Sequence, residues 1–174
     1  SFRWRGKYAH DLSSRETLDT QLGVFADFRP KIPAQFRSTP FVLLGNIHPA
    51  LQLEVLNQVE KPKLVMADTM NLWIKTEPKL LGELLTKIDL LVINDEEARD
   101  LTGIHNIVKT AVDIRKRGPK RLIIKRGEHG ALYFDDAGMF FAPGYPLEEV
   151  LDPTGAGDSF AGGLLGYIAR VMRK

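Results

Sequence analysis

The feature that most constrains the fold is a regular alternation of short apolar runs with stretches of helical periodicity. The apolar runs are 41–44, 63–67, 90–93 and 121–124, and the helical stretches are 49–59, 78–87, 95–102 and 106–117. Short runs that are apolar along their length are typical of strands buried on both faces. Strands that alternate with helices form right-handed crossovers. The pattern therefore predicts an α/β fold whose parallel sheet is covered by helices on both sides.

The two ends of the chain follow other patterns. Residues 131–134 and 139–142 flank a turn at 135–138, which predicts a hairpin, and a last helix is expected from about residue 155. Residues 22–28 alternate loosely between apolar and polar or small side chains, which favours a strand with one exposed face. We therefore expect a peripheral layer of strands and loop over 1–39 and an α/β body over 40–174.

Composition excludes several classes of protein. With 44% hydrophobic and 26% charged residues among 174, the chain is neither disordered nor collagen-like. A net charge of +2 is too small to indicate a nucleic-acid or membrane partner. The absence of cysteine excludes disulfides, thiolate metal sites and a cysteine nucleophile. No apolar run approaches the ~18 residues of a membrane span, so we expect a cytoplasmic protein.

The strongest chemical signal is the glycine-rich run at 151–163. Gly155 and Gly157 let the backbone approach a ligand, and the N–H groups of the helix that follows favour an anion. Asp158 either complements the helix dipole or takes a proton from a hydroxyl while the amides hold a phosphoryl group. A Walker loop would need Gly-Lys-Ser where Gly-Asp-Ser stands, and a dinucleotide fingerprint would need glycine in place of Phe160.

The run Asp-Pro-Thr-Gly-Ala-Gly-Asp-Ser-Phe-Ala-Gly-Gly resembles the C-terminal signature of the ribokinase-like (PfkB-type) sugar and nucleoside kinases. The resemblance implies a three-layer α/β/α fold with a mostly parallel central sheet, plus part of a small β lid. It also implies roles for the loop. Asp158 would be the base that activates the acceptor hydroxyl, and the amides of Gly155, Ala156 and Gly157 would form the anion hole. Asp152 and Thr154 fall where some members bind a monovalent cation such as K⁺, an optional feature here.

Two further segments resemble the family in order and spacing. Asn94 and Glu97 match an Asn-x-x-Glu motif that organises Mg²⁺ through water, although the same spacing is also a helix capping box. Lys125 and Gly127 match the strand end that binds ATP, with Lys125 facing the phosphates. A plain hairpin turn with a solvated Lys-Arg pair is the alternative for that segment.

Weaker candidates follow the first two apolar runs. Asn46 and His48 come after the first run, and Asp68, Thr69 and Asn71 after the second. In open α/β sheets, ligands bind at the carboxyl ends of the strands, so these side chains are candidates for the cleft. Asp68 is equally interpreted as a helix cap.

The resemblance covers the chain but only the central and C-terminal part of a typical family member. Either the sequence omits parts of the protein, or the chain is a fragment with unpaired strand edges, and a true fragment can be inactive with every motif residue intact. The function it implies is ATP-dependent phosphorylation of a hydroxyl on a small sugar. A nucleoside kinase, a non-catalytic nucleotide- or sugar-binding regulator and a purely structural domain are the alternatives. A homodimer formed through the lid is plausible for an open lid edge.

Overall fold

The computed structural model describes residues 3–8, 15–21, 23–25 and 27–172. Its body is a six-stranded sheet in which the strands follow one another in chain order. The strands are β3 (Phe41–Leu44), β4 (Leu64–Asp68), β5 (Leu90–Asn94), β6 (Arg121–Lys125), β7 (Ala131–Asp135) and β8 (Gly138–Ala142). β3 to β6 are parallel, and the β7–β8 hairpin adds two antiparallel strands at one edge. The four predicted apolar strands and the hairpin are confirmed.

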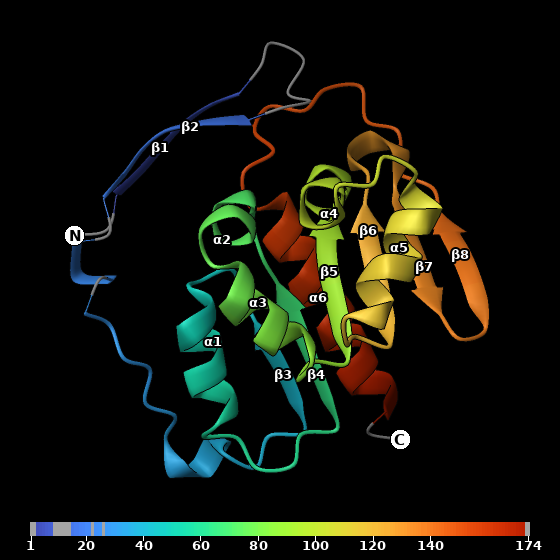
Figure 1. The fold of residues 1–174 in the computed structure, drawn as a ribbon. Helices are drawn as coiled ribbons and strands as arrows, with labels where there is room; N and C mark the ends of the chain where they lie inside the picture. The colour runs from blue at the N-terminus through green and yellow to red at the C-terminus, as the bar shows by residue number, and fades with distance from the viewer. Residues whose placement is uncertain (1–2, 9–14, 22, 26, 173–174) are drawn as a thin grey trace.

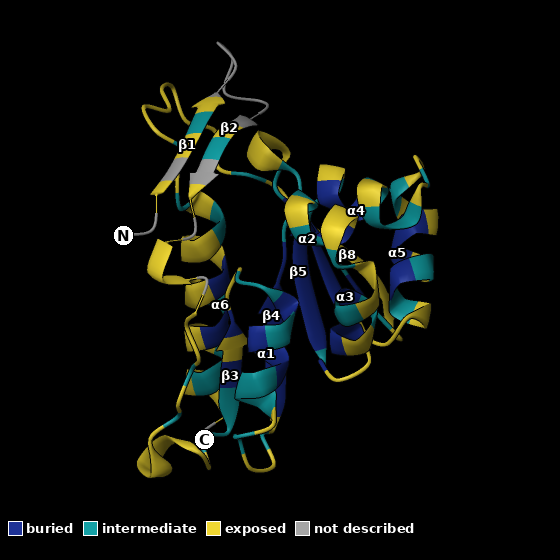
Figure 2. Ribbon diagram, turned by 60° about the vertical axis from the view of Figure 1, so that its left-hand side comes forward, coloured by how far each residue is buried: buried dark blue, intermediate teal, exposed yellow. Residues whose placement is uncertain are grey.

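Helices cover both faces of this sheet, as Figure 1 shows. One face carries α1 (Pro49–Leu56), α2 (Asn71–Thr76), α3 (Pro78–Leu85), α4 (Asp95–Thr102) and α5 (Ile107–Lys116). The other face carries α6 (Ala156–Met172). In Figure 2 the central strands β4 and β5 are buried, and the outer sides of the helices are exposed. The expected α/β/α architecture is therefore present.

Two apolar clusters, one on each face of the sheet, hold these layers together. Val65 and Leu91 pack in the cluster that contains residues of α1 to α5, whereas Met66 and Val92 pack in the cluster that contains α6 residues. Successive side chains of a strand point to opposite faces. The apolar runs are thus explained, because nearly all of their apolar residues meet a core. Leu43 on the edge strand β3 is an exception at 37% exposed.

The same alternation places three polar strand ends on the α6 face. Asp68, Asn94 and Lys125 end β4, β5 and β6, and each follows by two positions a residue of the α6 cluster. Asn94 pairs directly with Lys125 in the β5–β6 ladder. The register therefore gathers these side chains at the carboxyl edge of the sheet, on the side covered by α6.

The N-terminal segment contains strands, as expected, but not the one predicted at 22–28. β1 (Arg3–Tyr8) and β2 (Arg15–Gln21) form a separate antiparallel pair that stands apart from the main sheet in Figures 1 and 2. The strand expected at 22–28 is wrong, because Gly23–Phe25 forms a short 3-10 helix. Gly23 has a φ of 52°, a left-handed conformation that turns the chain and that glycine adopts without strain.

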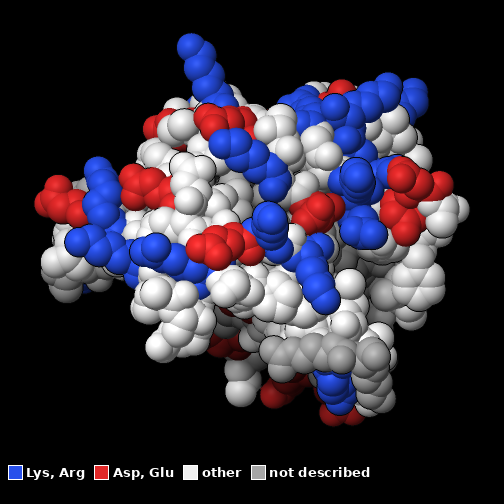
Figure 3. All heavy atoms as spheres, turned by 90° about the horizontal axis from the view of Figure 1, so that it is seen from below, with Lys and Arg blue, Asp and Glu red and all other residues white. Residues whose placement is uncertain are grey.

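Neither the helix lengths nor the surface charge at the lower end of the molecule in Figure 1 is unusual. Within the described part of the chain, no helix is long and apolar enough to cross a lipid bilayer. Figure 3 views the end of the molecule at which the parallel strands begin, and basic and acidic side chains are interspersed there. That end lies opposite the strand ends that carry Asp68, Asn94 and Lys125.

Candidate active site

A cleft of about 950 Å³ opens at the carboxyl ends of β4, β5 and β6, beside the N-terminus of α6. Eight residues singled out from the sequence for catalysis, nucleotide or metal line it: Asn94, Glu97, Lys125, Gly127, Gly155, Ala156, Gly157 and Asp158. The weaker candidates Asn46, Asp68, Thr69 and Asn71 line it as well. Segments far apart in the chain therefore meet at one place, the sheet edge where ligands bind in open α/β folds.

The glycine-rich loop enters α6 through a tight turn. The N–H of Ala156 donates to the carbonyl of Pro153 at 3.1 Å, and the N–H of Ser159 donates to the carbonyl of Gly155 at 2.9 Å. Gly155 has a φ of 79°, which favours glycine at this position. Asp158 lies in the first turn of the 17-residue helix, exposed at the cleft. A carboxylate and a helix N-terminus with its donor groups thus share one wall of the cleft.

The side chain of Lys125, at the end of β6, reaches the glycine-rich loop from the sheet. A Cβ built on Gly157 would lie 2.9 Å from the Nζ atom of Lys125, so the glycine leaves room for the ammonium against the backbone of α6. The side chain of Lys125 is 18% exposed. This position favours the prediction that Lys125 faces a bound phosphate over the alternative of a solvated turn residue.

Asn94 and Glu97 form a reciprocal capping box at the start of α4. The N–H of Glu97 donates to Oδ1 of Asn94 at 2.7 Å, and the N–H of Asn94 donates to Oε2 of Glu97 at 2.9 Å. Glu97 is only 5% exposed, yet it lines the cleft together with Asn94. The capping interpretation is therefore confirmed as geometry, and the metal role stays a prediction for the same two side chains.

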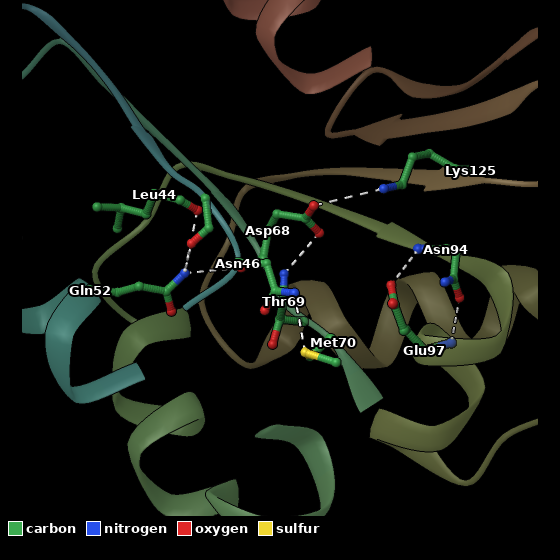
Figure 4. A network of polar contacts seen from close by, with 10 residues as sticks. Leu44, Asn46, Gln52, Asp68, Thr69, Met70, Asn94, Glu97 and Lys125 are labelled. Atoms are coloured by element: carbon green, nitrogen blue, oxygen red, sulfur yellow. Dashed lines mark hydrogen bonds and ion pairs between the residues drawn. The ribbon is translucent and has the colours of Figure 1, made fainter. Parts of the chain in front are cut away.

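Asp68, a weak candidate from the sequence, has a more specific place in the cleft than its motif-free position indicated. Its carboxylate lies 3.9 Å from Nζ of Lys125, and its Oδ1 accepts the N–H of Thr69 at 2.8 Å (Figure 4). Burial raises the pKa of Asp68, and the negative charge of Asp158 adds to this rise. The positive charge of Lys125 and the hydrogen bond from the Thr69 N–H oppose it. The helix-cap interpretation is wrong, since α2 begins after Met70.

Two loops close the β6 side of the cleft, backbone against backbone. A Cβ on Gly130 would lie 2.0 Å from the carbonyl oxygen of Ala142, and one on Gly144 would lie 2.2 Å from that of Glu128. Gly127 and Gly130 have φ values of 54° and 86°. Gly144 and its neighbours were missed in the sequence, because a Pro-Gly pair indicates only a turn and not what the turn contacts.

Three predicted candidates are not among the residues that line the cleft, although Asp152 and Thr154 flank the lining residue Pro153. Asp152 and Thr154 form a local turn in which Oδ1 of Asp152 accepts the N–H of Thr154 at 2.8 Å. Hydrogen bonds from the hydroxyl and the N–H of Thr154 lower the pKa of Asp152. His48 caps α1 by accepting the N–H of Ala50 at 3.2 Å, and its ring lies 4.9 Å from that of Trp73. The K⁺ assignment to Asp152 and Thr154 therefore stays a prediction.

The donor set of the cleft suits a magnesium ion bound chiefly by a nucleotide. Among the described residues, no group of three or more His, Asp or Glu side chains is arranged to hold a metal. Mg²⁺ keeps several waters and is commonly held by one or two carboxylates together with substrate phosphates. The Glu97 carboxylate beside the amide of Asn94 fits that arrangement.

Comparisons with known proteins agree with this architecture. The family model for pfkB family carbohydrate kinases matches residues 26–173. The chain is 34% identical over 145 residues to the cytidine kinase of Thermococcus kodakarensis. This match covers 80% of this chain and 51% of the cytidine kinase.

Two solved structures extend the comparison. A nucleoside kinase of Methanocaldococcus jannaschii, described as an archaeal member of the ribokinase family, has a TM-score of 0.67 at 22% identity, over 90% of this chain and 50% of that one. The ribokinase of Arabidopsis thaliana, complexed with ribose and ATP, has a TM-score of 0.62 at 28% identity, over 75% of this chain and 43% of the ribokinase. The chain spans about half the length of these relatives.

Proposed function

The chain belongs to the pfkB family of carbohydrate kinases, and from this premise we propose that it carries the phosphoryl-transfer site of an ATP-dependent kinase whose acceptor is a hydroxyl of a small sugar. One observation carries the proposal. Asp158 and the first-turn amides of α6 face the same cleft as Lys125, so a proton acceptor, an anion site and a cation meet at one point.

The reaction follows from these groups. Asp158 takes the proton of the acceptor hydroxyl as its oxygen forms a bond to the γ-phosphorus, and the bond between that phosphorus and the β-γ bridging oxygen breaks to release ADP. Of the three predicted anion-hole amides, those of Gly155 and Gly157 donate to the phosphoryl oxygens, which carry the charge in the transition state. The N–H of Ala156 already donates to the carbonyl of Pro153. Lys125 adds a positive charge on the same side.

The remaining cleft residues hold the nucleotide. Gly127, Pro143 and Gly144 border the side on which ATP would lie. Asn94 and Glu97 would hold the waters around Mg²⁺. The metal, when bound, neutralises charge on the phosphates. The buried carboxylate of Glu97 accepts the N–H of Asn94 and so keeps one orientation, which suits a group that orders water.

A nucleoside is the second candidate acceptor, and a specific observation favours it. The match to the cytidine kinase, at 34% identity, extends over 80% of this chain. The chemistry at Asp158 is the same for both acceptors, because a nucleoside also offers a sugar hydroxyl.

The test is ADP formation with a panel of free sugars and nucleosides. We expect Asp158→Asn to lower the turnover by about 10²–10⁴-fold while ATP still binds. Asp113→Asn, which removes a partly exposed carboxylate of α5 that is paired with Arg117, serves as the control and should keep full turnover. Turnover with nucleosides alone would replace the sugar by a nucleoside. Full turnover in Asp158→Asn would refute the proposed base, and a chain that binds no nucleotide would be a structural domain.

A further inference from the structure

We propose that Asp68 is a positioning residue for Lys125. Its fixed, buried carboxylate holds the ammonium beneath the first turn of α6, from where the ammonium transfers to the phosphoryl group when the nucleotide binds. This inference rests on the proposed function, because it assigns Asp68 a task in that same site. It goes beyond the motifs of the sequence, since Asp68 belongs to none of them.

Asp68 is anchored on two sides. Its Oδ1 accepts the N–H of Thr69 at 2.8 Å, and its backbone carbonyl accepts Nε2 of Gln52 at 3.1 Å. The same Nε2 atom also donates to the carbonyls of Leu44 and Gly45 at 3.3 and 2.9 Å, which ties the end of β4 to the end of β3 (Figure 4). Gln52 is 1% exposed, so this anchor is shielded from water.

Lys125 is the mobile partner. The 3.9 Å between its Nζ and Oδ2 of Asp68 is too long for a hydrogen bond, so attraction between the charges links the two groups. The ammonium can therefore move toward a phosphoryl oxygen without first breaking a hydrogen bond to Asp68. The movement needed is small, since a Cβ on Gly157 would already lie 2.9 Å from Nζ.

The charges around the pair favour such a transfer. The Asp68 side chain is 10% exposed, and a largely buried carboxylate attracts a nearby cation more strongly than a solvated one does. A bound phosphate brings negative charge to the anion site at the helix start and competes for Lys125. Without Asp68, a lysine side chain with many rotamers would have to be ordered at each binding event, at an entropic cost.

A matched carboxylate at the other end of the sheet provides the control. Asp89 precedes β5, and its Oδ2 accepts the N–H of Val65 at 2.8 Å, much as Asp68 accepts the N–H of Thr69. Asp89 lies outside the cleft lining. Asp89→Asn therefore removes a carboxylate bonded to a backbone N–H without touching the site.

The test is a double-mutant cycle in the full chain. We expect Asp68→Asn to lower kcat/KM for ATP by about 10-fold, and Lys125→Met by at least as much. The variant that carries both changes should be no worse than Lys125→Met alone, because Asp68 acts through Lys125. Asp89→Asn should keep the wild-type value. Additive losses, or an unchanged kcat/KM in Asp68→Asn, would overturn the inference.

A second readout separates this inference from the proposed function. The rate at which a small, amine-reactive acetylating reagent labels Lys125, followed by peptide mass mapping, measures how firmly the side chain is held in the absence of nucleotide. We expect faster labelling in Asp68→Asn than in the wild type and no change in Asp89→Asn. Unchanged labelling in Asp68→Asn overturns the positioning role whatever the turnover. Faster labelling in a chain without kinase activity supports the pairing and refutes the proposed function instead.

Discussion

Replacing Asn94 tests whether the capping box at the start of α4 also serves the metal. Asn94→Ala removes the Oδ1 atom that accepts the N–H of Glu97 at 2.7 Å, whereas the reciprocal bond uses the backbone N–H of residue 94 and survives. Loss of such a cap costs about 1 kcal/mol. In a domain of this size that lowers Tm by about 2–4 °C. Asn106→Ala removes the cap of α5, a 3.0 Å bond from the N–H of Lys109, and should cost a similar amount.

The informative variant is Asn94→Ser, because serine caps helices about as well as asparagine. Its free energy of unfolding should stay within about 0.5 kcal/mol of the wild-type value. The serine lacks the amide proposed to order water around Mg²⁺, so we expect a Mg²⁺ requirement raised by about 10-fold, the usual effect of losing a group that supports a metal. Thermal unfolding followed by circular dichroism and ADP formation over a Mg²⁺ titration measure the two quantities.

Two results would refute this reasoning. If Asn94→Ser keeps the wild-type Mg²⁺ requirement, Asn94 is a helix cap and nothing more. If Asn106→Ala raises the Mg²⁺ requirement as much as Asn94→Ala does, the effect comes from lost stability and not from the site, since Asn106 lies outside the cleft lining.

Two further predictions concern the fold. Gly130→Ala should lower Tm by several degrees, at a cost of about 1–3 kcal/mol, because its φ is 86° and its Cβ would meet the Ala142 carbonyl at 2.0 Å. Gly82→Ala on α3, with nothing within 4 Å of its Cβ, should instead raise it. Asp68→Asn should raise the free energy of unfolding at pH 7, measured by urea denaturation. The raised pKa of Asp68 means that its charge destabilises the fold above that pKa, so the gain should vanish as the pH falls below the ordinary value of 3.8.

The body of the fold was predictable because its signal is local. Strands buried on both faces leave wholly apolar runs, and β3, β4, β5 and β6 each lie within one residue of a predicted run. The strand expected at 22–28 failed for the opposite reason. Its loose alternation is a weak pattern, and the positive φ of Gly23 allows a turn there. α2 was missed because six residues give too short a helical period to detect.

In the site, too, the residues in local motifs were predictable, and the contacts between distant segments were not. The glycine loop, Asp158, Asn94 and Glu97 lie in compact motifs, so short stretches of sequence located them. The contact between Asp68 and Lys125 joins β4 to β6 across β5, and the packing of Gly144 on the carbonyl of Glu128 joins two loops separated by a hairpin. No spacing along the chain encodes such contacts, because they depend on strand order and on which face each strand end presents.

Asp68 shows why the stability and the proposed function of this site make opposing demands. Burial disfavours its charge, and an asparagine at the same position could still accept the N–H of Thr69 without that penalty. The hydrogen bond therefore does not account for an acid at this position. What a carboxylate adds and an amide lacks is the attraction that holds Lys125 against the first turn of α6. If Asp68→Asn stabilises the fold at neutral pH and at the same time weakens phosphoryl transfer, the charge serves the reaction at the expense of the fold. A variant that gains stability and keeps full transfer would leave the acid unexplained and the positioning role refuted.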